Sequence, residues 1–594
     1  MFLICTADKR FWKNDIPVVF LGEWCRLYSD RQLLSKMNDD VIDYRWRDRS
    51  LFRADWIYMR SVYLRCLEDL AEWLNTVHGM QWGLRPWEIL VGPWLRNFIE
   101  ITFERYHSLQ AAERSGLVSE TLIMDERSIE SHVPRNYSDF VQGFCSDEYN
   151  QSLYSLIISR LNLFSYTTVD SRRVCDKLVG QAPESKLRKL LGFLVKPSGM
   201  RKRKTVFLYN SGFRRVHQIL LELSLGQIPS LRRVSNILDF SDKVYSPEMR
   251  TKFGFHDNGD IFEKLVRSLI PQQIPQTYME SFESLKQLSC KEFPMDAKLV
   301  VSAGSDLSDD LFKVWLSEQV FRGAKFCAVQ HGGGFGTSDV MTNEDIQSRT
   351  SDFFITWGWK LNGNQHRSIA APAGKLVGIN ARKSRDHKKN VLWVGMGLPR
   401  YSYKLGSEPV GPLFLEYILD QIRFGKKLSA EVIKNIRYRA YQREYGWEEK
   451  KRLGAELPDL RFSQASVPFL RDMEEAGLIV TTCNSTTFLQ SLSANIPTVI
   501  FWNPQYWELR EEAGEYFKNL EKQGIFHTTP ESAALHVNQI AEDPLAWWEK
   551  SDVQDAKNQF CREYARTDKR WLKQWTQLIR TILKGSFRKR DIER

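Results

Sequence analysis

The chain has 594 residues, of which 42% are hydrophobic, and a formal net charge of +11. Such a length is enough for two or three domains, each with its own buried core. No apolar run approaches the ~18 to 20 residues of a membrane-spanning helix, and the start lacks the charge and length of a signal peptide, so we expect a cytoplasmic protein. The nine cysteines stand singly, without a CxxC pair or a Cys/His cluster, which argues against a zinc site and a disulfide framework.

The excess of basic residues suits anionic partners, and it is densest in the tail 584–594. No helix-turn-helix, RNP motif or zinc finger is visible, so we do not expect a nucleic-acid partner. Anionic lipid headgroups or phosphorylated substrates account for the same charge.

Two short apolar runs, 2–5 and 18–21, open the chain and indicate buried strands. The second leads into Glu23, which is a candidate general base or sugar-hydroxyl ligand, or else a surface acid beside a tryptophan. Apolar residues at helical spacing over 54–77 and about 93–112 then predict two core helices.

A strand-helix alternation begins at 205–209 and resumes at 299–302, where Asp306 follows the strand as a second candidate base. Further strands are predicted at 326–329, 353–357 and 375–379. Strands that recur with helices between them indicate a parallel sheet covered on both faces.

The segment 325–338, KFCAVQHGGGFGTS, is a buried strand that runs into a glycine-rich loop. Open α/β sheets bind ligands at the carboxyl ends of their strands. Gly332, Gly333 and Gly334 permit positive φ and a close approach of backbone N–H groups to an anion, while His331 titrates near neutrality. The loop therefore predicts a phosphate or carboxylate site; the alternative is a tight turn whose histidine bonds the next strand.

A polar, basic break at 381–390 is the predicted linker to a second unit. The strand 391–394 runs into Gly395-Met-Gly397, as at the first strand of a nucleotide-binding unit, and Gly397 is a candidate donor contact.

Residues 431–443 are predicted to be helical, which would place Arg439 and Arg443 four residues apart on one face. Such a pair can clamp a diphosphate or carboxylate, although a solvated helix face gives the same pattern.

The segment 478–502 predicts strand, polar loop, short helix and strand. Its helix begins with four polar residues: Asn484, Ser485, Thr486 and Thr487. The hydroxyls, the free N–H groups and the dipole of the helix together form an anion site; the alternative is a plain N-cap. Glu508 lies in the loop after the second strand, close to the same ligand.

Six motifs together resemble a family of transferases encoded in bacterial O-antigen and capsule gene clusters. The family is generally treated as similar to GT-B glycosyltransferases. The motifs are LGEWC (21–25), GPWL (92–95), QHGGGFG (330–336), TWGW (356–359), YGW (445–447) and NSTTFLQSLSANIPTVIFW (484–502).

The resemblance implies an α/β protein with two Rossmann-like domains facing a cleft and extra N-terminal helices. The acceptor side would be 1–380, the nucleotide-donor side 391–545, and 546–594 would be helices that cross back plus a basic tail. It also implies a nucleotide-activated donor sugar, CMP- or NDP-linked, and a glycan or lipid-linked glycan acceptor. Gln490 stands where related motifs often have a glutamate on the donor ribose.

We expect no cofactor and no metal, because no DxD carboxylate pair suited to a metal-bound diphosphate is evident. Arg439, Arg443 and the helix start at 484–487 would hold the donor phosphate, with His331 as general base or leaving-group stabiliser. The alternatives are transfer of glycerol phosphate from a CDP carrier, and a non-catalytic scaffold with a nucleotide fold. We further expect the helix 571–583 to pack on residues before 380, and the tail 584–594 to give weak contact with the inner face of the cytoplasmic membrane.

Overall fold

The computed structural model describes residues 1–13, 15–173, 204–229, 245–251, 259–361, 368–379, 390–464 and 466–585. The predicted linker lies outside these ranges except for residue 390, and so does the basic tail beyond residue 585.

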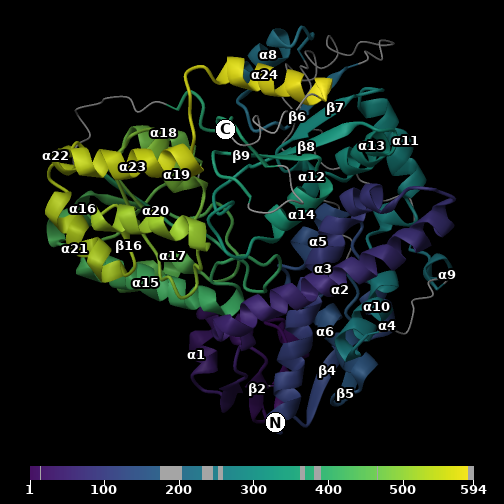
Figure 1. Ribbon diagram of the computed structural model, residues 1–594. Coiled ribbons are helices and arrows are strands. Elements are labelled where there is room, and N and C mark those ends of the chain that lie inside the picture. Colours follow the sequence, from purple (N-terminus) through teal and green to yellow (C-terminus); the bar gives the residue numbers. More distant parts are fainter. Residues whose placement is uncertain are drawn as a thin grey trace, which may run out of the picture.

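Three parallel sheets, each flanked by helices, form the framework of the molecule (Figure 1). The first has the order β3 (Asp39–Val41), β2 (Val18–Phe20), β1 (Phe2–Ile4), β4 (Glu120–Met124), β5 (Ser165–Val169). The second has the order β10 (Ser368–Ala370), β9 (Phe353–Thr356), β8 (Lys325–Val329), β7 (Leu299–Ser302), β6 (Val206–Tyr209). The third has the order β13 (Arg461–Phe462), β12 (Ile436–Arg439), β11 (Val391–Val394), β14 (Leu478–Thr481), β15 (Thr498–Phe501), β16 (Phe526–His527).

The predicted α/β class is confirmed, and the central strands are buried on both faces, as their unbroken apolar sequences require. Residues 1–380, expected to build one Rossmann-like unit, contain two sheets. The strand predicted at 375–379 is wrong: Leu376 and Val377 both donate backbone hydrogen bonds to Ala373, so the chain turns there.

Two long helices, α2 (Arg49–His78) and α3 (Leu84–Arg114), lie between the first and second sheets, where extra N-terminal helices were predicted (Figure 1). Within α3, Arg96 and Glu100 form a fully buried ion pair. Glu100 also accepts hydrogen bonds from Thr342 Oγ1 at 2.7 Å and from the backbone N–H of Leu405 at 2.9 Å. One buried carboxylate thus fixes two loops that belong to different sheets.

The remaining helices cover the sheets. Those before the third sheet are α1 (Arg31–Leu34), α4 (Glu126–Ser131), α5 (Tyr137–Gly143), α6 (Asp147–Leu161), α8 (Arg215–Ser224), α9 (Pro247–Arg250), α10 (Ile261–Gln273), α11 (Phe282–Glu292), α12 (Ser305–Ser308), α13 (Asp310–Phe321) and α14 (Thr342–Thr350). Those that follow are α15 (Phe414–Lys427), α16 (Ala430–Asn435), α17 (Glu449–Glu456), α18 (Phe469–Glu474), α19 (Thr486–Ser493), α20 (Glu511–Lys522), α21 (Pro530–Ile540), α22 (Pro544–Trp548), α23 (Ser551–Tyr564) and α24 (Trp571–Lys584).

Helix α24 follows the elements of the third sheet in the chain, but it packs on the second sheet beside α8 (Figure 1). Trp575, Ile579 and Ile582 are buried in the core formed by the strands of that sheet. The Trp575 indole donates to the carbonyl of Pro372 at 2.8 Å. The packing predicted for helix 571–583 is therefore confirmed.

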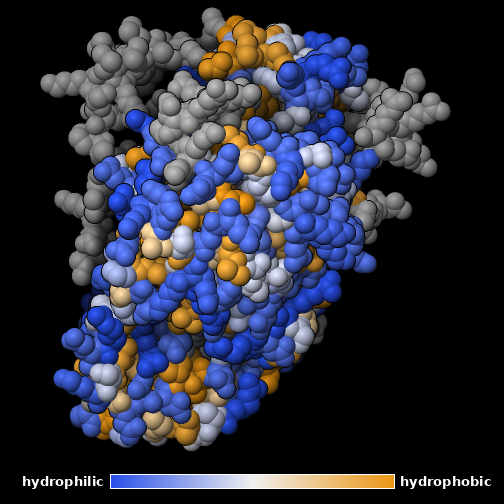
Figure 2. Space-filling view, turned by 90° about the vertical axis from the view of Figure 1, so that its left-hand side faces the viewer, coloured by the Kyte–Doolittle hydropathy of each residue, from blue (hydrophilic) through white to orange (hydrophobic). Residues whose placement is uncertain are grey.

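Figure 2 shows a mostly hydrophilic face on which hydrophobic side chains gather at the top, at the height of α8 and α24 in Figure 1. Val216, Leu220 and Leu223 of α8 are 67%, 42% and 55% exposed. Among the helices that the described ranges contain, none has the length and apolar character needed to cross a membrane.

Candidate functional site

The loops that follow β8 and β14 meet at the carboxyl edges of the second and third sheets. The backbone N–H of Gly333 donates to Thr486 Oγ1 at 3.1 Å. The Asn484 amide donates to Thr337 Oγ1 at 3.0 Å and to Ser338 Oγ at 3.2 Å. Segments about 150 residues apart in sequence are thereby joined directly.

The position within the third sheet favours ligand binding. The chain places β12 and β13 on one side of β11 and β14 on the other, so the winding direction reverses between β11 and β14. Open α/β sheets bind ligands in the crevice at such a switch point. Asn484 and Ser485 follow β14 at this point.

A cavity of about 210 Å³ lies between the two loops, and we call it the His331 cavity. Six predicted site residues line it: His331, Gly332, Gly333, Asn484, Ser485 and Thr486. The sequence thus identified both walls of this cavity, although the two segments belong to different sheets. Phe335 and Ser338, from the predicted loop 325–338, and Trp507, beside Glu508, also line the cavity. The lining residues that the sequence did not indicate are Met341, Asn343, Lys404, Leu405, Gly406, Ser407 and Glu408.

His331 is held as a neutral base. Burial lowers the pKa of its imidazole to about 4, and the nearby ammonium groups of Lys404 and Lys375 act in the same direction. Its Nδ1 is buried and has no hydrogen-bond partner among the described residues. The ring packs edge-on against Phe335 at 4.9 Å between centroids, which fixes its plane. A neutral, oriented imidazole can accept a proton from a ligand hydroxyl.

Lys404 and Glu408 bring opposite charges to the cavity wall. Burial raises the pKa of the Glu408 carboxyl, and Lys404 opposes this rise. Within the described part of the chain, the Lys404 ammonium has no ion-pair partner, and it lies 5.3 Å from the ring of Tyr403. Such a cation can hold a ligand anion.

Lys404 and Glu408 belong to the irregular segment between β11 and α15. The sequence patterns indicated only the glycines at the start of this segment as candidate contacts. The signal that could have found Lys404 and Glu408 is the length of the segment, because a loop of more than ~12 to 15 residues inside a compact domain is commonly functional.

The glycines act in two ways. Gly334 and Gly336 have φ of +82° and +72°, the left-handed conformation predicted for this loop. Gly333 does not have a positive φ, but a Cβ there would lie 2.2 Å from the carbonyl carbon of Ser485. Gly333 is therefore required by the close approach of the two loops.

Helix α19 starts at the cavity without a side-chain cap. The hydroxyl of its N-cap residue, Ser485, pairs with Thr487 Oγ1 at 2.9 Å and not with a backbone N–H. The first N–H groups of α19, with the positive end of its dipole, are consequently available to an anion in the cavity.

The two predicted arginines do not lie together on a helix. Helix α16 ends at Asn435, and Arg439 lies in the mostly buried strand β12, which pairs with β11. Its guanidinium forms a buried ion pair with Asp472.

Arg443 and Gly397 line a separate hollow of about 90 Å³ beside Tyr441 and Tyr445.

Glu508 and Asp306 are occupied by neighbours. Glu508 forms a two-pronged ion pair with Arg49 at 2.6 and 3.0 Å. Asp306 accepts two hydrogen bonds from the Gln347 amide at 3.1 and 2.9 Å, and burial raises its pKa to about 6. Neither side chain lines the His331 cavity.

Glu23 lies at the carboxyl edge of the first sheet and pairs with Arg26 at 3.3 Å. The switch point of that sheet is filled by the chain itself: Arg400 binds Asp147 at 2.7 Å and the carbonyl of Trp24. Tyr401 also donates to Asp147. This edge therefore serves as a contact between the first and third sheets.

The cysteines that the structure describes are all free, and in the same ranges no group of three or more His, Cys, Asp or Glu side chains is arranged to hold a metal ion.

A family model described as LIC12162 family transferase matches residues 1–579. No curated protein matches the chain. Among solved structures, the crystal structure of Acinetobacter baumannii MurG matches 64% of this chain and 100% of its own, with 11% sequence identity and a TM-score of 0.31.

Proposed function

Since the chain belongs to the LIC12162 family of transferases, we propose that it moves a sugar from a nucleotide-activated donor to a glycan acceptor, with the donor phosphate in the His331 cavity. The observation that carries the proposal is the composition of this cavity. It combines an uncapped helix start, an unpaired lysine within the described part of the chain, and a neutral imidazole at the carboxyl edges of two parallel sheets.

In the proposed reaction an acceptor hydroxyl attacks the anomeric carbon of the donor sugar, and the bond from that carbon to the oxygen of the nucleotide phosphate breaks. The acceptor proton passes to His331 Nε2 or Nδ1, or to Glu408. The departing oxygen takes the electron pair, and its negative charge is stabilised by Lys404 and the α19 N–H groups. The N–H groups belong to the rigid start of a helix and are oriented before the reaction, which makes them effective for transition-state charge.

The finer assignments are that the acceptor is a bacterial surface polysaccharide, O-antigen or capsule, free or lipid-linked, and that the sugar is an ulosonic acid or another nucleotide-linked sugar. They are supported by the motifs at 330–336, 356–359 and 484–502, which resemble transferases from such gene clusters.

We also propose weak contact with the inner face of the cytoplasmic membrane. The exposed apolar side chains of α8 support it, because Val216, Leu220 and Leu223 recur at helical spacing on one face. Co-sedimentation with anionic vesicles should fall when all three are replaced by serine. Equal co-sedimentation of the variant and the parent protein would refute this contact.

Release of free nucleotide from UDP-, GDP-, dTDP- and CMP-linked sugars, in the presence of a surface glycan fraction, tests the transfer. The parent protein should release nucleotide and extend the glycan. His331→Ala should lose ~100 to 10,000-fold of this activity, as is typical for a general base, while it keeps its fold and its nucleotide binding. Activity within about threefold of the parent would exclude His331 from the chemistry. Transfer of glycerol phosphate from a CDP carrier, without sugar transfer, would replace the proposed reaction.

A further inference from the structure

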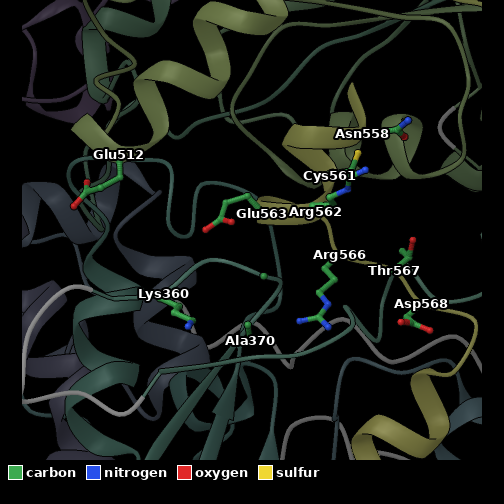
Figure 3. Close-up of a pocket in the computed structure, with 11 residues that line it drawn as sticks. Lys360, Ala370, Glu512, Asn558, Cys561, Arg562, Glu563, Arg566, Thr567 and Asp568 are labelled. Atoms are coloured by element: carbon green, nitrogen blue, oxygen red, sulfur yellow. The ribbon is translucent and has the colours of Figure 1, made fainter. Parts of the chain in front are cut away.

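A second and larger cavity, about 960 Å³, opens at the carboxyl ends of β9 and β10 beside α23 (Figure 3). We call it the Arg566 cavity. Its lining is mostly polar: Gly358, Lys360, Ala370, Glu512, Asn558, Cys561, Arg562, Glu563, Arg566, Thr567 and Asp568.

The Arg566 cavity is next to the His331 cavity along the same sheet edge. Strand β8 leads to His331 and its neighbour β9 leads to Gly358 and Lys360. Trp359 is directed away from the Arg566 cavity, since its indole packs against Gly336 and lies 5.7 Å from the guanidinium of Arg510. Trp359 lines neither cavity.

Three cations reach the Arg566 cavity from two segments: Lys360 from the loop after β9, and Arg562 and Arg566 from the end of α23 and the residues that follow it. In the described part of the chain, none of the three forms an ion pair. Figure 3 shows the side chains of Lys360 and Arg566 projecting into the same space from two sides. Such spacing suits a ligand that is held between two positive charges.

The backbone of Arg566 is fixed on both sides. Its N–H donates to the carbonyl of Trp357 at 2.8 Å, and its own carbonyl accepts from the N–H of Ala373 at 2.8 Å. Gly358 permits this arrangement, because a Cβ there would lie 2.3 Å from the carbonyl oxygen of Glu563. A half-buried arginine on a rigid backbone is already oriented for a ligand and loses little freedom when it binds.

Two carboxylates of the lining, Glu563 and Asp568, lie near these cations, but within the described ranges neither forms an ion pair with Lys360, Arg562 or Arg566. Asp568 accepts from the backbone N–H of Arg570 at 2.6 Å and from the Gln574 amide at 2.7 Å. Glu563 lies at the end of α23, where burial raises the pKa of its carboxyl while Lys360 lowers it. Asn558 and Thr567 add neutral polar groups that can bond sugar hydroxyls.

We propose that the Arg566 cavity binds the acidic group, a carboxylate or a phosphate, of an anionic glycan acceptor, with Lys360, Arg562 and Arg566 as its ligands. The role of the bound glycan as acceptor rests on the proposed function, whereas the oxyanion site itself rests on the cavity alone. A cavity of this size holds one or two sugar units, and its place beside the His331 cavity would bring an acceptor hydroxyl toward a donor bound there.

Calorimetric titration of the full chain with D-glucuronate and with glucose 1-phosphate tests the site and separates the carboxylate from the phosphate. Arg566→Gln and Lys360→Gln should each weaken binding of the preferred probe by ~10-fold or more, since each removes a charge-assisted hydrogen bond. Lys569→Gln is the matched control, because this lysine is exposed and does not line the cavity.

A Kd that is the same in Arg566→Gln, Lys360→Gln and the parent protein would overturn the proposal, and so would absence of binding of both probes to the parent. Loss of binding in Lys404→Gln with no change in Arg566→Gln would assign the probe to the His331 cavity and would also overturn it. If no nucleotide binds while Arg566→Gln still loses the probe, the oxyanion site stands and only its role as acceptor site fails.

Discussion

Gly333 is the residue at which the loops of the second and third sheets come closest. Gly333→Ala should push the loop away from Ser485, because the added Cβ would lie 2.2 Å from a carbonyl carbon that belongs to the backbone. We expect a loss of stability of ~1 to 3 kcal/mol, typical of overpacking, and weaker nucleotide binding. Thermal unfolding with and without nucleotide measures both effects.

Gly454→Ala is the control for this substitution. Gly454 lies inside α17, no atom is within 4 Å of the position of a Cβ, and its φ is ordinary. Alanine there should leave binding unchanged and add up to ~1 kcal/mol of helix stability. Equal behaviour of the two variants would show that the loops are not in close contact.

His331 should titrate far below an ordinary histidine. Its pKa of about 4 lies under the ~6.5 of an unfolded chain, so protons favour the unfolded state between these values. Its contribution to stability is therefore complete above ~6.5 and is lost as the pH falls toward 4. NMR titration of ¹³C-labelled histidines, with the signal assigned by its loss in His331→Asn, measures the pKa. A midpoint at or above 6.5 would contradict the burial of this imidazole.

Sequence reasoning found the residues that carry a local pattern. Glycines after an apolar run predicted the His331 loop, and hydroxyl residues before a short apolar helix predicted the start of α19. Lys404 and Glu408 carry no such pattern, and their positions depend on Glu100, which fixes Leu405 from a helix of another sheet. A contact of that kind cannot be derived from local spacing.

At the scale of elements, α24 joins the part of the chain that contains the third sheet to the second sheet. Trp575→Ala should cost ~3 to 5 kcal/mol, because it removes a buried indole and its hydrogen bond to Pro372. Hydrogen exchange in 571–584 should accelerate. Lys573→Ala, at an exposed position of the same helix, should change neither quantity. Unchanged exchange in Trp575→Ala would mean that α24 is held by other contacts.

Helix α24 was predictable because its tryptophans and aliphatic residues keep one helical face over the whole element. Strand β12 was not: Ile436–Arg439 contains two arginines and follows a helix-forming stretch, so propensity favoured a longer helix. Pairing with β11 overrides that preference, and a buried Asp472 satisfies Arg439.

At the scale of the whole molecule, the first sheet was the hardest part to predict. Strands β1 and β2 were predicted from their apolar runs, but β3 begins with two aspartates and carries no apolar pattern. Strand β4 follows only after α2 and α3, so its pairing with β1 is a long-range contact. In the third sheet, β11, β14 and β15 were predicted from their apolar runs, whereas β12 was predicted as helix.

The central claim is that the His331 cavity binds a nucleotide through Lys404 and the start of α19. Equilibrium binding of UDP, GDP, CDP, CMP and dTDP to the parent protein, Lys404→Gln and the exposed control Lys434→Gln tests it most directly. We predict that one of these nucleotides binds the parent and the control equally, and Lys404→Gln ~10-fold more weakly, as expected for loss of one charge-assisted contact. Binding of none of them to the folded parent, or the same Kd in Lys404→Gln and the parent, would contradict the claim.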